Sequence, residues 1–388
     1  MRIATLDGID AAPADEWNRL AGSGNPFLCH EFLAALEHNG CVGTQFGWLP
    51  RHLAAYDEHG RLVGAMPLYE KDNSYGEFVF DWAWADAYER NGLRYYPKLV
   101  TAIPYTPATG ARLLVDPAAP APEAVAAALV AQTLEYARAQ ALSSAHWLFT
   151  DRRDTGRLES QGLMLRLGCQ FHWHNAGYRD FDDFLDTFSA QKRKKLRRER
   201  RRVGEAGVEL RIIHGDDADE ATLRTAHHFY HSTFDRKWGI PTLNLGFFTE
   251  VARTMGSRLV LVLAYENDRP VAGAICFRGD DTLYGRHWGC DVHHHSLHFE
   301  ACYYQGIEYC IRHGLGHFEP GAQGEHKISR GFVPTPTWSA HWIAHPGFRD
   351  AIGDFLRRET PAMERYMQEL TTHLPYKAPA GSGTGSTG

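Results

Sequence analysis

The sequence predicts a mixed α/β fold made of two copies of one unit. A hairpin-like segment occurs twice, as AAYDEHGRLVGA around Gly64 and as LAYENDRPVAGA around Gly273. After each segment the predicted order of elements is the same: helix, strand, short helix, strand. Chance similarity of two hairpins is the alternative, but the shared order of the later elements favours an internal duplication.

Size and composition fit two soluble domains. The chain has 388 residues, of which 44% are hydrophobic and 23% charged, and its net charge is −6. Such a balance is typical of a globular protein and provides no overall attraction to nucleic acid or membrane. No apolar run is long enough to span a bilayer, and the N-terminus lacks the basic flank and apolar core of a signal peptide. We therefore expect a cytoplasmic protein.

Cysteine and histidine usage argues against disulfides and metals. The seven cysteines are odd in number, lie mostly in apolar runs and form no CxxC pair, so we expect buried thiols. His227 and His231 share a helix face, and HHHSLH adds four more histidines, but no HExxH signature accompanies them. We predict no bound metal and no tightly bound cofactor.

Apolar periodicity predicts the elements of the first half in order. Helical patterns cover residues 14–39 with a break at 22–26, and a hairpin follows at residues 53–69. Residues 78–107 are rich in aromatic and turn-forming residues and look too irregular for a helix. The remaining elements expected here are a strand at 111–115, a helix at 122–140, a strand at 145–150, a helix at 158–167 and a strand at 171–178.

The second half repeats this alternation after a short apolar helix and a basic one. We place the domain boundary near residue 178, with domains at 1–178 and 179–375 and a flexible tail at 376–388. The elements expected after the basic helix are a helix at 221–234, strands at 259–265, 271–278 and 282–288, a helix at 297–313, a strand at 317–319, a short helix at 326–332, a strand at 337–344 and a helix at 348–370.

The segment GHFEPGAQGEHKISRGF, residues 316–332, concentrates the groups that a transfer reaction needs. It follows a predicted strand, the place where ligands usually sit in α/β proteins. We predict Glu319 and His326 as catalytic residues that move a proton, and Lys327 and Arg330 as binders of an anionic group, with Gln323 beside them. The alternative is a charged, solvated turn that opens a helix.

Other polar and aromatic residues of the second half are candidate substrate contacts. A cation beside an indole suits the carboxylate and the apolar part of a ligand, although a structural cation–π pair has the same sequence. Two further residues near the start of the helix at 297–313 either face the same cleft or cap and pack that helix. These candidates are Lys237, Trp238, Arg286, His287, Trp288, Glu300 and Tyr303.

The run QKRKKLRRERRRV predicts a basic surface helix with a thin apolar stripe formed by Leu196 and Val203. Clustered lysines and arginines bind phosphates by counterion release, so we weigh tRNA or another phosphorylated ligand equally with a structural role. No helix-turn-helix or zinc-finger pattern surrounds the run, so we expect no sequence-specific binding of DNA. The predicted polyanion-binding residues are Lys192, Lys194, Lys195, Arg197, Arg198 and Arg201.

With these stretches in hand, the chain resembles the FemAB-like proteins, N-acyltransferases built of two GNAT-like domains and often named for peptidoglycan biosynthesis. The resemblance covers nearly the whole chain to about residue 375. It rests on NPFLCHEFLAALE, VGAMPLYEK, QKRKKLRRERRRV, FRGDDTLYGRHWGC and EPGAQGEHKISRGF with TPTWSAHW. It implies two GNAT-like (acyl-CoA N-acyltransferase-like) mixed-sheet domains, and a donor that is either aminoacyl-tRNA or acyl-CoA.

One departure from the GNAT pattern concerns the donor. GNAT enzymes that use CoA hold its pyrophosphate with a Q/R-x-x-G-x-G/A turn between a strand and a helix. The only match here is RRVGEA, residues 201–206, at the end of the basic helix. That place is wrong for the turn, which weakens the prediction of acetyl-CoA as donor.

We therefore expect an N-acyltransferase that moves an acyl or aminoacyl group to an amine acceptor, which the resemblance suggests is a cell-wall precursor. Such a reaction needs a base for the amine proton, donors for the developing oxyanion, and proximity. No Ser-His-Asp spacing or G-x-S-x-G motif supports a hydrolase. The rival from another class is a non-catalytic protein that uses the same double fold to bind an anionic ligand.

Overall fold

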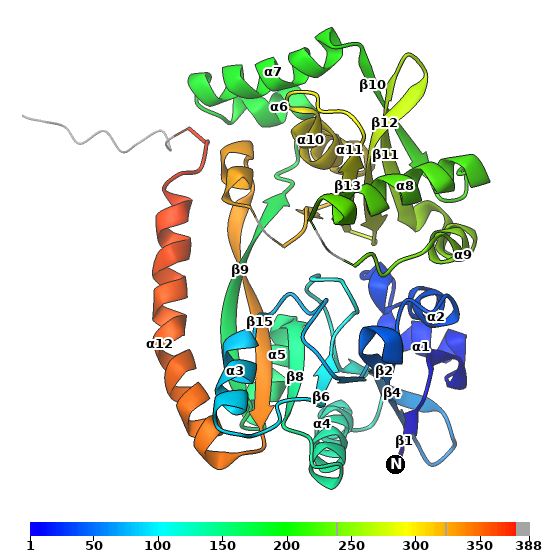
Figure 1. Cartoon of the computed structure of the whole chain (residues 1–388), viewed down its shortest axis with the longest axis vertical. Helices are drawn as coiled ribbons and strands as arrows, with labels where there is room; N and C mark the ends of the chain where they lie inside the picture. Colours follow the sequence, from blue (N-terminus) through cyan, green and yellow to red (C-terminus); the bar gives the residue numbers. More distant parts are fainter. Residues whose placement is uncertain (238–239, 323, 378–388) are drawn as a thin grey trace, which may run out of the picture.

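The computed structural model describes residues 1–237, 240–322 and 324–377, except for the side chains of residues 235–237. It is an elongated α/β molecule with helices packed on the faces of its sheets (Figure 1).

The first half of the chain contains β1 (Arg2–Leu6), α1 (Ala14–Ala21), α2 (His30–His38), β2 (Trp48–Pro50), β3 (His52–Tyr56), β4 (Leu62–Met66), β5 (Tyr69–Lys71), α3 (Trp82–Arg90), β6 (Lys98–Thr101), β7 (Leu114–Val115), α4 (Pro122–Ala139), β8 (Ser144–Thr150), α5 (Arg152–Ser160) and β9 (Met164–His174). Short 3₁₀ turns η1 (Ile9–Ala11), η2 (Pro26–Leu28) and η3 (Thr44–Phe46) connect some of them.

The second half contains α6 (Phe181–Asp186), α7 (Ala190–Glu205), β10 (Val208–His214), α8 (Glu220–Lys237), α9 (Leu245–Met255), η4 (Gly256–Arg258), β11 (Leu259–Glu266), β12 (Arg269–Arg278), β13 (Thr282–Cys290), α10 (Leu297–Phe299), the π-helical turn η5 (Glu300–Tyr304), α11 (Gln305–His313), β14 (His317–Glu319), the 3₁₀ helix η6 (Glu325–Arg330), β15 (Val333–Ile343) and α12 (Pro346–Thr371).

Strand order confirms the duplication. The strands β1-β3-β4-β7 form one antiparallel run, and β10-β11-β12-β13 form another in the same order. The register also shifts at matching places, after Ala55 in β3 and after Ala264 in β11. Gly64 and Gly273 each lie in the third strand of the run, where a Cβ would collide with Val125 of α4 or Phe229 of α8. Each glycine thus lets a helix pack closely on its sheet.

Two long strands cross between the halves. β9 pairs with β14 through Trp173 and His174 and with β15 over most of its length, while β15 pairs with β8. These pairings join strands of both halves into one eleven-stranded sheet. The boundary at residue 178 stays a prediction, because strands on either side of it complete each other's sheets.

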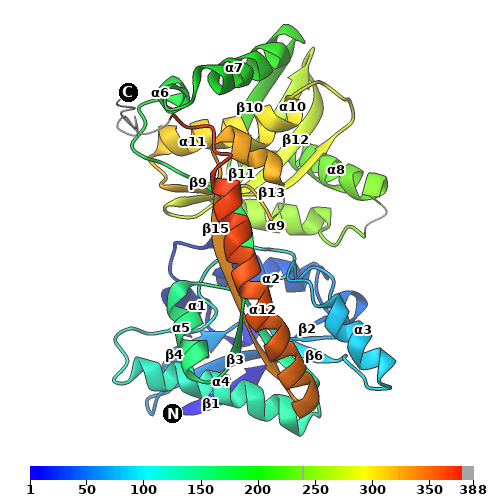
Figure 2. The ribbon, with the colours of Figure 1, turned by 90° about the vertical axis from the view of Figure 1, so that its left-hand side faces the viewer.

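The halves also share an aromatic core. Phe27 of η2, just before α2, lies 5.3 Å from Phe277 and 5.1 Å from Tyr284, measured between ring centroids. Phe32 contacts Phe247 of α9 in the same way. Helix α12 then packs along β9 and β15 and spans both halves (Figure 2). Burial of apolar side chains between the halves and under α12 therefore holds the two units in one arrangement.

Two predictions of secondary structure are wrong. Trp82–Arg90 is a regular helix, α3, although its aromatic content suggested an irregular segment. Its buried face is formed by Trp84 and Tyr88, four residues apart, so a helical period was present in the sequence. The helix expected at 158–167 ends at Ser160, and Met164 already begins β9. Pairing with β15 along the whole strand overrides the local helical pattern there.

Candidate functional site

Glu319 is the last residue of β14, at the point where two parallel strands separate. β13 and β14 pair from Thr282–His317 to Tyr284–Glu319, and beyond that pair β14 ends while β13 continues to Cys290 beside β12. Pro320 follows Glu319 and cannot donate to a sheet. The carboxyl group therefore lies at the opening of a gap between neighbouring strands.

Burial dominates the electrostatics of Glu319. Its side chain is 14% exposed, and Oε2 is buried without a hydrogen-bond partner among the described residues. Loss of solvation raises the pKa of the carboxyl to about 8, although the backbone of Thr109 and the guanidinium groups of Arg286 and Arg112 oppose the shift. The carboxyl thus titrates near neutral pH, which suits a general acid or base.

A small cavity next to Glu319 is lined by both halves of the chain. It is about 10 Å³ in volume, room for roughly one water molecule. Its walls are Pro107, Ala108, Gln170, Tyr284, Gly285, Arg286, Glu319 and Gly321. The site is therefore shared between the units rather than contained in one of them.

The predicted contact Arg286 lies in this cavity wall. Its Nη2 donates to the backbone oxygen of Tyr105, and burial lowers its pKa to about 10. At neutral pH it remains a cation facing the Glu319 carboxyl. The other wall is fixed by Gln170, which donates to the Pro107 oxygen at 2.8 Å and lies 3.0 Å from Nε2 of His172.

Lys327 is the second buried ionisable group of the predicted loop. Its Nζ donates to the oxygen of Gly321 at 2.7 Å, which places the amine beside the Glu319 cavity. The residue is only 2% exposed, and burial lowers its pKa to about 8. Gly321 is the one hydrogen-bond partner of the amine among the described residues, and it is neutral, so further N–H donors remain for an anionic ligand.

His326 lies with a different group of residues. The residue is exposed in η6, and its Nε2 is 2.8 Å from the hydroxyl of Tyr303. Among the contacts of the described residues, none joins His326 to Glu319. Trp288 lies against His298, and His298 in turn faces the His326 and Tyr303 rings. His287 packs edge-on to Tyr230, and burial lowers its pKa to about 3.

Arg330 and Glu300 are engaged in ion pairs with the basic helix. Arg330 is 3% exposed; its Nη2 lies 3.0 Å from Glu199 of α7, and its guanidinium covers the Phe299 ring at 3.4 Å. Glu300 accepts from Arg200 of α7 at 3.0 Å. The structure therefore gives Arg330 a partner within the protein and fastens η6 to α7.

Three predicted contacts lie wholly or partly outside the described residues. Trp238 and Gln323 belong to that group, and for Lys237 the structure describes the backbone at the end of α8 but not the side chain. Their roles stay predictions.

The basic helix α7 has the predicted apolar stripe. Leu196 and Val203 are buried, and Glu199 lies on the same face. Several cations on the outer face already have acidic neighbours: Arg193 pairs with Asp186, Arg197 with Asp182, and Arg201 with Glu205. Within the described part of the chain, Lys192, Lys194 and Arg198 form no ion pair or side-chain hydrogen bond. The free charge available to a polyanion is smaller than the sequence suggests.

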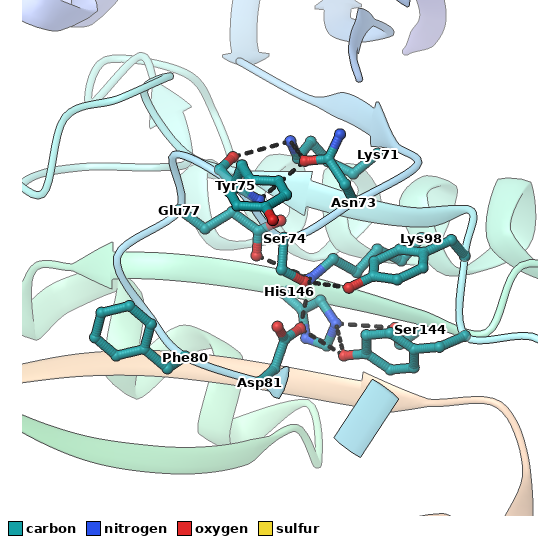
Figure 3. Close-up of polar contacts among 12 residues, drawn as sticks. Lys71, Asn73, Ser74, Tyr75, Glu77, Phe80, Asp81, Lys98, Ser144 and His146 are labelled. Carbon is teal, nitrogen blue, oxygen red and sulfur yellow. Dashed lines mark hydrogen bonds and ion pairs between the residues drawn. The ribbon is translucent and has the colours of Figure 1, made fainter. Parts of the chain in front are cut away.

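Sequence reasoning missed a buried polar cluster in the first half (Figure 3). Lys98 of β6 has no exposed surface; its Nζ donates to Glu77 at 2.8 Å, to Ser74 at 2.9 Å and to Asp81. Glu77 and Asp81 raise the pKa of Lys98 despite burial, and burial raises the pKa of Glu77 to about 7. Asp81 in the aromatic-rich segment and Glu77 just before it were the available signal, but a loop sequence does not say which residues face inward.

The described residues contain no group of three His, Cys, Asp or Glu side chains arranged to hold a metal ion. In the same part of the chain, no helix has the length and apolar character that crossing a bilayer requires.

Comparison with known families now places the molecule. The model of the FemAB-like family, described as peptidoglycan biosynthesis/recognition, matches residues 8–378. The chain belongs to the FemAB-like family. No curated protein matches the sequence.

Solved structures share the fold of this FemAB-like protein at low sequence identity. FemX is 11% identical with a TM-score of 0.54, over 91% of this chain and 100% of its own. The C-terminal domain (DUF2156) of a candidate lysylphosphatidylglycerol synthetase from Agrobacterium fabrum is 9% identical with a TM-score of 0.54, over 88% and 95% of the two chains. L-PGS from Bacillus licheniformis is 12% identical with a TM-score of 0.50, over 89% and 98%. Family and fold together support acyl or aminoacyl transfer in a general sense.

Proposed function

We propose that this FemAB-like protein transfers an acyl or aminoacyl group to an amine, with Glu319 as the general base. The observation that carries the proposal is the buried carboxyl at the end of β14, which has a pKa of about 8 and one oxygen with no hydrogen-bond partner among the described residues. A general base works best when its pKa lies near the operating pH, and it must face a space where the amine fits. Glu319 has both properties: its pKa is about 8, and its cavity has room for about one small group of atoms.

The reaction forms one bond and breaks one. The amine nitrogen attacks the carbonyl carbon of an ester or thioester donor and forms the C–N bond. Oε2 of Glu319 accepts the proton that the nitrogen loses. The bond from the carbonyl carbon to the leaving oxygen or sulfur then breaks, and the leaving group receives that proton from Glu319. The carboxyl returns to its starting state.

Cations near Glu319 supply the electrostatic part. Arg286 lines the same cavity and is the cation that we assign to the carbonyl oxygen. Lys327, which donates to Gly321 in the cavity wall, is assigned to the capture of an anionic part of the substrate. A positive charge close to the carbonyl oxygen stabilises the oxyanion of the tetrahedral intermediate, and the low dielectric of a buried site strengthens that effect. We assign no catalytic step to Arg330, since Glu199 already neutralises it.

For the donor we favour aminoacyl-tRNA over acyl-CoA. RRVGEA lies at the C-terminal end of α7, where carbonyl oxygens rather than N–H groups are unpaired, so it is unsuited to a pyrophosphate. The outer face of the same helix carries Lys192, Lys194 and Arg198 for contact with phosphates. The family description supports a cell-wall precursor as the amine acceptor.

Donor release tests the proposal. Purified protein is incubated with charged tRNA or with acetyl-CoA and a panel of amines, and free tRNA or free CoA is measured for the wild type and for Glu319→Gln. Amine-dependent release that the variant lacks supports the proposal. Tight ligand binding without release from either donor supports the non-catalytic alternative instead. Native mass spectrometry of the purified protein identifies the ligand that accompanies it.

A further inference from the structure

The loop between β5 and α3, residues 72–81, buries polar side chains and exposes aromatic ones. Ser74, Glu77 and Asp81 point inward, and one buried amine, Nζ of Lys98, binds all three (Figure 3). The aromatic residues between and after them point outward: Tyr75 is 70% exposed and Phe80 is 55% exposed. A surface loop ordinarily does the opposite, because buried charges lose solvation and exposed rings meet water.

Several further contacts hold the loop in this arrangement. Lys71, also fully buried, donates to the Tyr75 oxygen at 3.2 Å, and Arg166 of β9 donates to the Phe80 oxygen at 2.7 Å. Phe78 has a φ of 60°, a left-handed conformation that aromatic residues rarely adopt. A fixed loop that presents aromatic side chains to solvent is typical of a ligand-binding surface rather than of a flexible connection.

The outward rings border two adjoining hollows. One, of about 330 Å³, is lined by Ser74, Tyr75, Gly76, Phe78, Phe80, Trp82 and Ala322. The other, of about 210 Å³, shares Phe78, Phe80 and Ala322 and continues between β9, β15 and α12 along Leu167, Trp338 and Met363. Its charged members Arg166 and Glu359 neutralise each other at 2.8 Å. The combined groove, which we call the aromatic groove, is suited to an uncharged apolar chain.

The inner end of the aromatic groove reaches the site of the proposed reaction. Gln170 lines both the second hollow and the Glu319 cavity, and Ala322 of the groove follows Gly321 of the cavity. At this end Oε2 of Glu319, which has no partner in the part of the chain that the structure describes, is a hydrogen-bond acceptor. An acceptor of this kind calls for a ligand that ends in N–H groups.

We propose that the aromatic groove binds the amine acceptor, and that this acceptor carries its amine on a long alkyl or aryl tail. The tail lies along Phe78, Phe80 and Trp338, and the amine meets Glu319. The proposal rests on the proposed function, since it names the substrate class of the same site. Aromatic walls bind such a ligand through two interactions. They make apolar contact with the tail, and the faces of their rings attract an ammonium group.

Binding of simple amines tests the proposal without any donor. The full chain is titrated by calorimetry with butylamine, octylamine and dodecylamine, and with octanoate, which has a tail of similar length and the opposite charge. Each methylene that enters the groove should tighten binding roughly four-fold, and octylamine should bind more tightly than octanoate. Equal affinity along the amine series, or octanoate binding as tightly as octylamine, would overturn the proposal.

Substitutions locate the tail. Phe78→Ser with Phe80→Ser should reduce the affinity for octylamine to that for butylamine, and Phe80→Ser alone should do so in part. Phe78 is 40% exposed and Phe80 is 55% exposed, so we expect the thermal midpoint to change little. Leu93→Ser is the matched control, because Leu93 is 39% exposed, close to the 40% of Phe78, and lies outside the groove. Wild-type affinity in the phenylalanine variants would contradict the assignment.

Glu319→Gln separates this inference from the proposed function. The variant should retain the dependence on tail length and lose both turnover and the preference for amine over carboxylate. If Glu319→Gln turns over fully while the dependence on length remains, the proposed base is wrong and the groove stands. If it loses turnover and wild-type affinity proves independent of length, the base stands and the groove assignment falls.

Discussion

Corresponding strands of the two units end at residues with different side chains. In the first unit β8 ends at Thr150, which bridges to Gly110 as a parallel neighbour and whose hydroxyl lies 2.7 Å from that of Thr155. In the second unit β14 ends at Glu319, which pairs with Tyr284 and keeps one oxygen without a partner among the described residues. The duplicated backbone therefore contains one satisfied hydroxyl and one available carboxyl at equivalent places.

The difference teaches where function lies in a duplicated fold. Strand order and hairpin irregularities are the same in both units, because they depend on backbone pairing and on the apolar faces of the sheets. The reactive group is present in one unit only, and residues of the other unit, including Gln170, form the opposite wall. One copy thus provides the chemistry while the other contributes to enclosing it.

The largest expected effect follows from removing the carboxyl. Glu319→Gln keeps the shape of the side chain and removes the base, so kcat should fall by about 10² to 10⁴, the usual contribution of general acid–base catalysis. Thr150→Ser at the equivalent place in the first unit retains the hydroxyl and should leave kcat unchanged. Initial rates with saturating donor and amine measure both. Equal loss in the two variants would remove the distinction between the units.

The second largest effect concerns the buried ion pair between Arg330 of η6 and Glu199 of α7. Glu199→Ala leaves the buried guanidinium of Arg330 without its counterion, which should lower the free energy of unfolding by about 3–5 kcal/mol. Lys195→Gln removes only the half-exposed 4.0 Å neighbour of Glu199 and should change stability by less than about 1 kcal/mol. Urea denaturation compares the two variants. Similar stabilities of the two variants would show that the fold does not depend on this ion pair.

Lys327→Met should act on substrate capture. The change replaces a buried amine by an apolar chain of similar length, so the fold should remain while KM for an anionic substrate rises about ten-fold, the loss of one hydrogen bond to a charged group. Lys377→Met, an exposed lysine near the C-terminal end of the described chain, is the control. A lowered kcat with an unchanged KM would instead give Lys327 a role in the transition state.

Titration of Glu319 should make activity and stability depend on pH in opposite directions. As a base it must be ionised, so kcat/KM should rise with pH and level off above about pH 8. The folded state keeps a proton that the unfolded chain loses near the ordinary carboxyl pKa, so the contribution of Glu319 to stability should fall as pH rises from about 4.5 to about 8. Unfolding measured across this range for the wild type and Glu319→Gln isolates the contribution. Parallel curves would place the carboxyl in contact with solvent.

The smallest expected effect belongs to the outer face of α7. Lys194→Gln with Arg198→Gln should weaken tRNA binding several-fold at low salt and reduce the slope of log affinity against log salt by about two, one for each lost phosphate contact. Arg357→Gln with Arg358→Gln on α12 is the control for net charge. Filter binding at several salt concentrations provides the slopes. Unchanged binding at low salt would make α7 a solvated face.

The sequence predicted most elements that depend on local periodicity. The hairpins, the helix at 122–140, the basic helix with its stripe at Leu196 and Val203, and the strand that ends at Glu319 are confirmed. The site residues of the second half stay predictions, and the structure sorts them into separate groups around Glu319, His326 and Arg330. Spacing along a loop does not specify which side chains converge, since a turn can direct neighbours to opposite sides.

By itself, the sequence determined the fold class, the duplication and the presence of a charged loop after a strand, because these follow from apolar periods and local turn chemistry. Only the tertiary structure decided that β9 and β15 cross between the units and that Glu319 is buried against residues of the first half. It also decided that the loop at 72–81 turns its charges inward onto Lys98 and its rings outward. The physical reason is the same in each case: burial and pairing are set by residues distant in the chain, and a side chain's environment fixes its charge and its role.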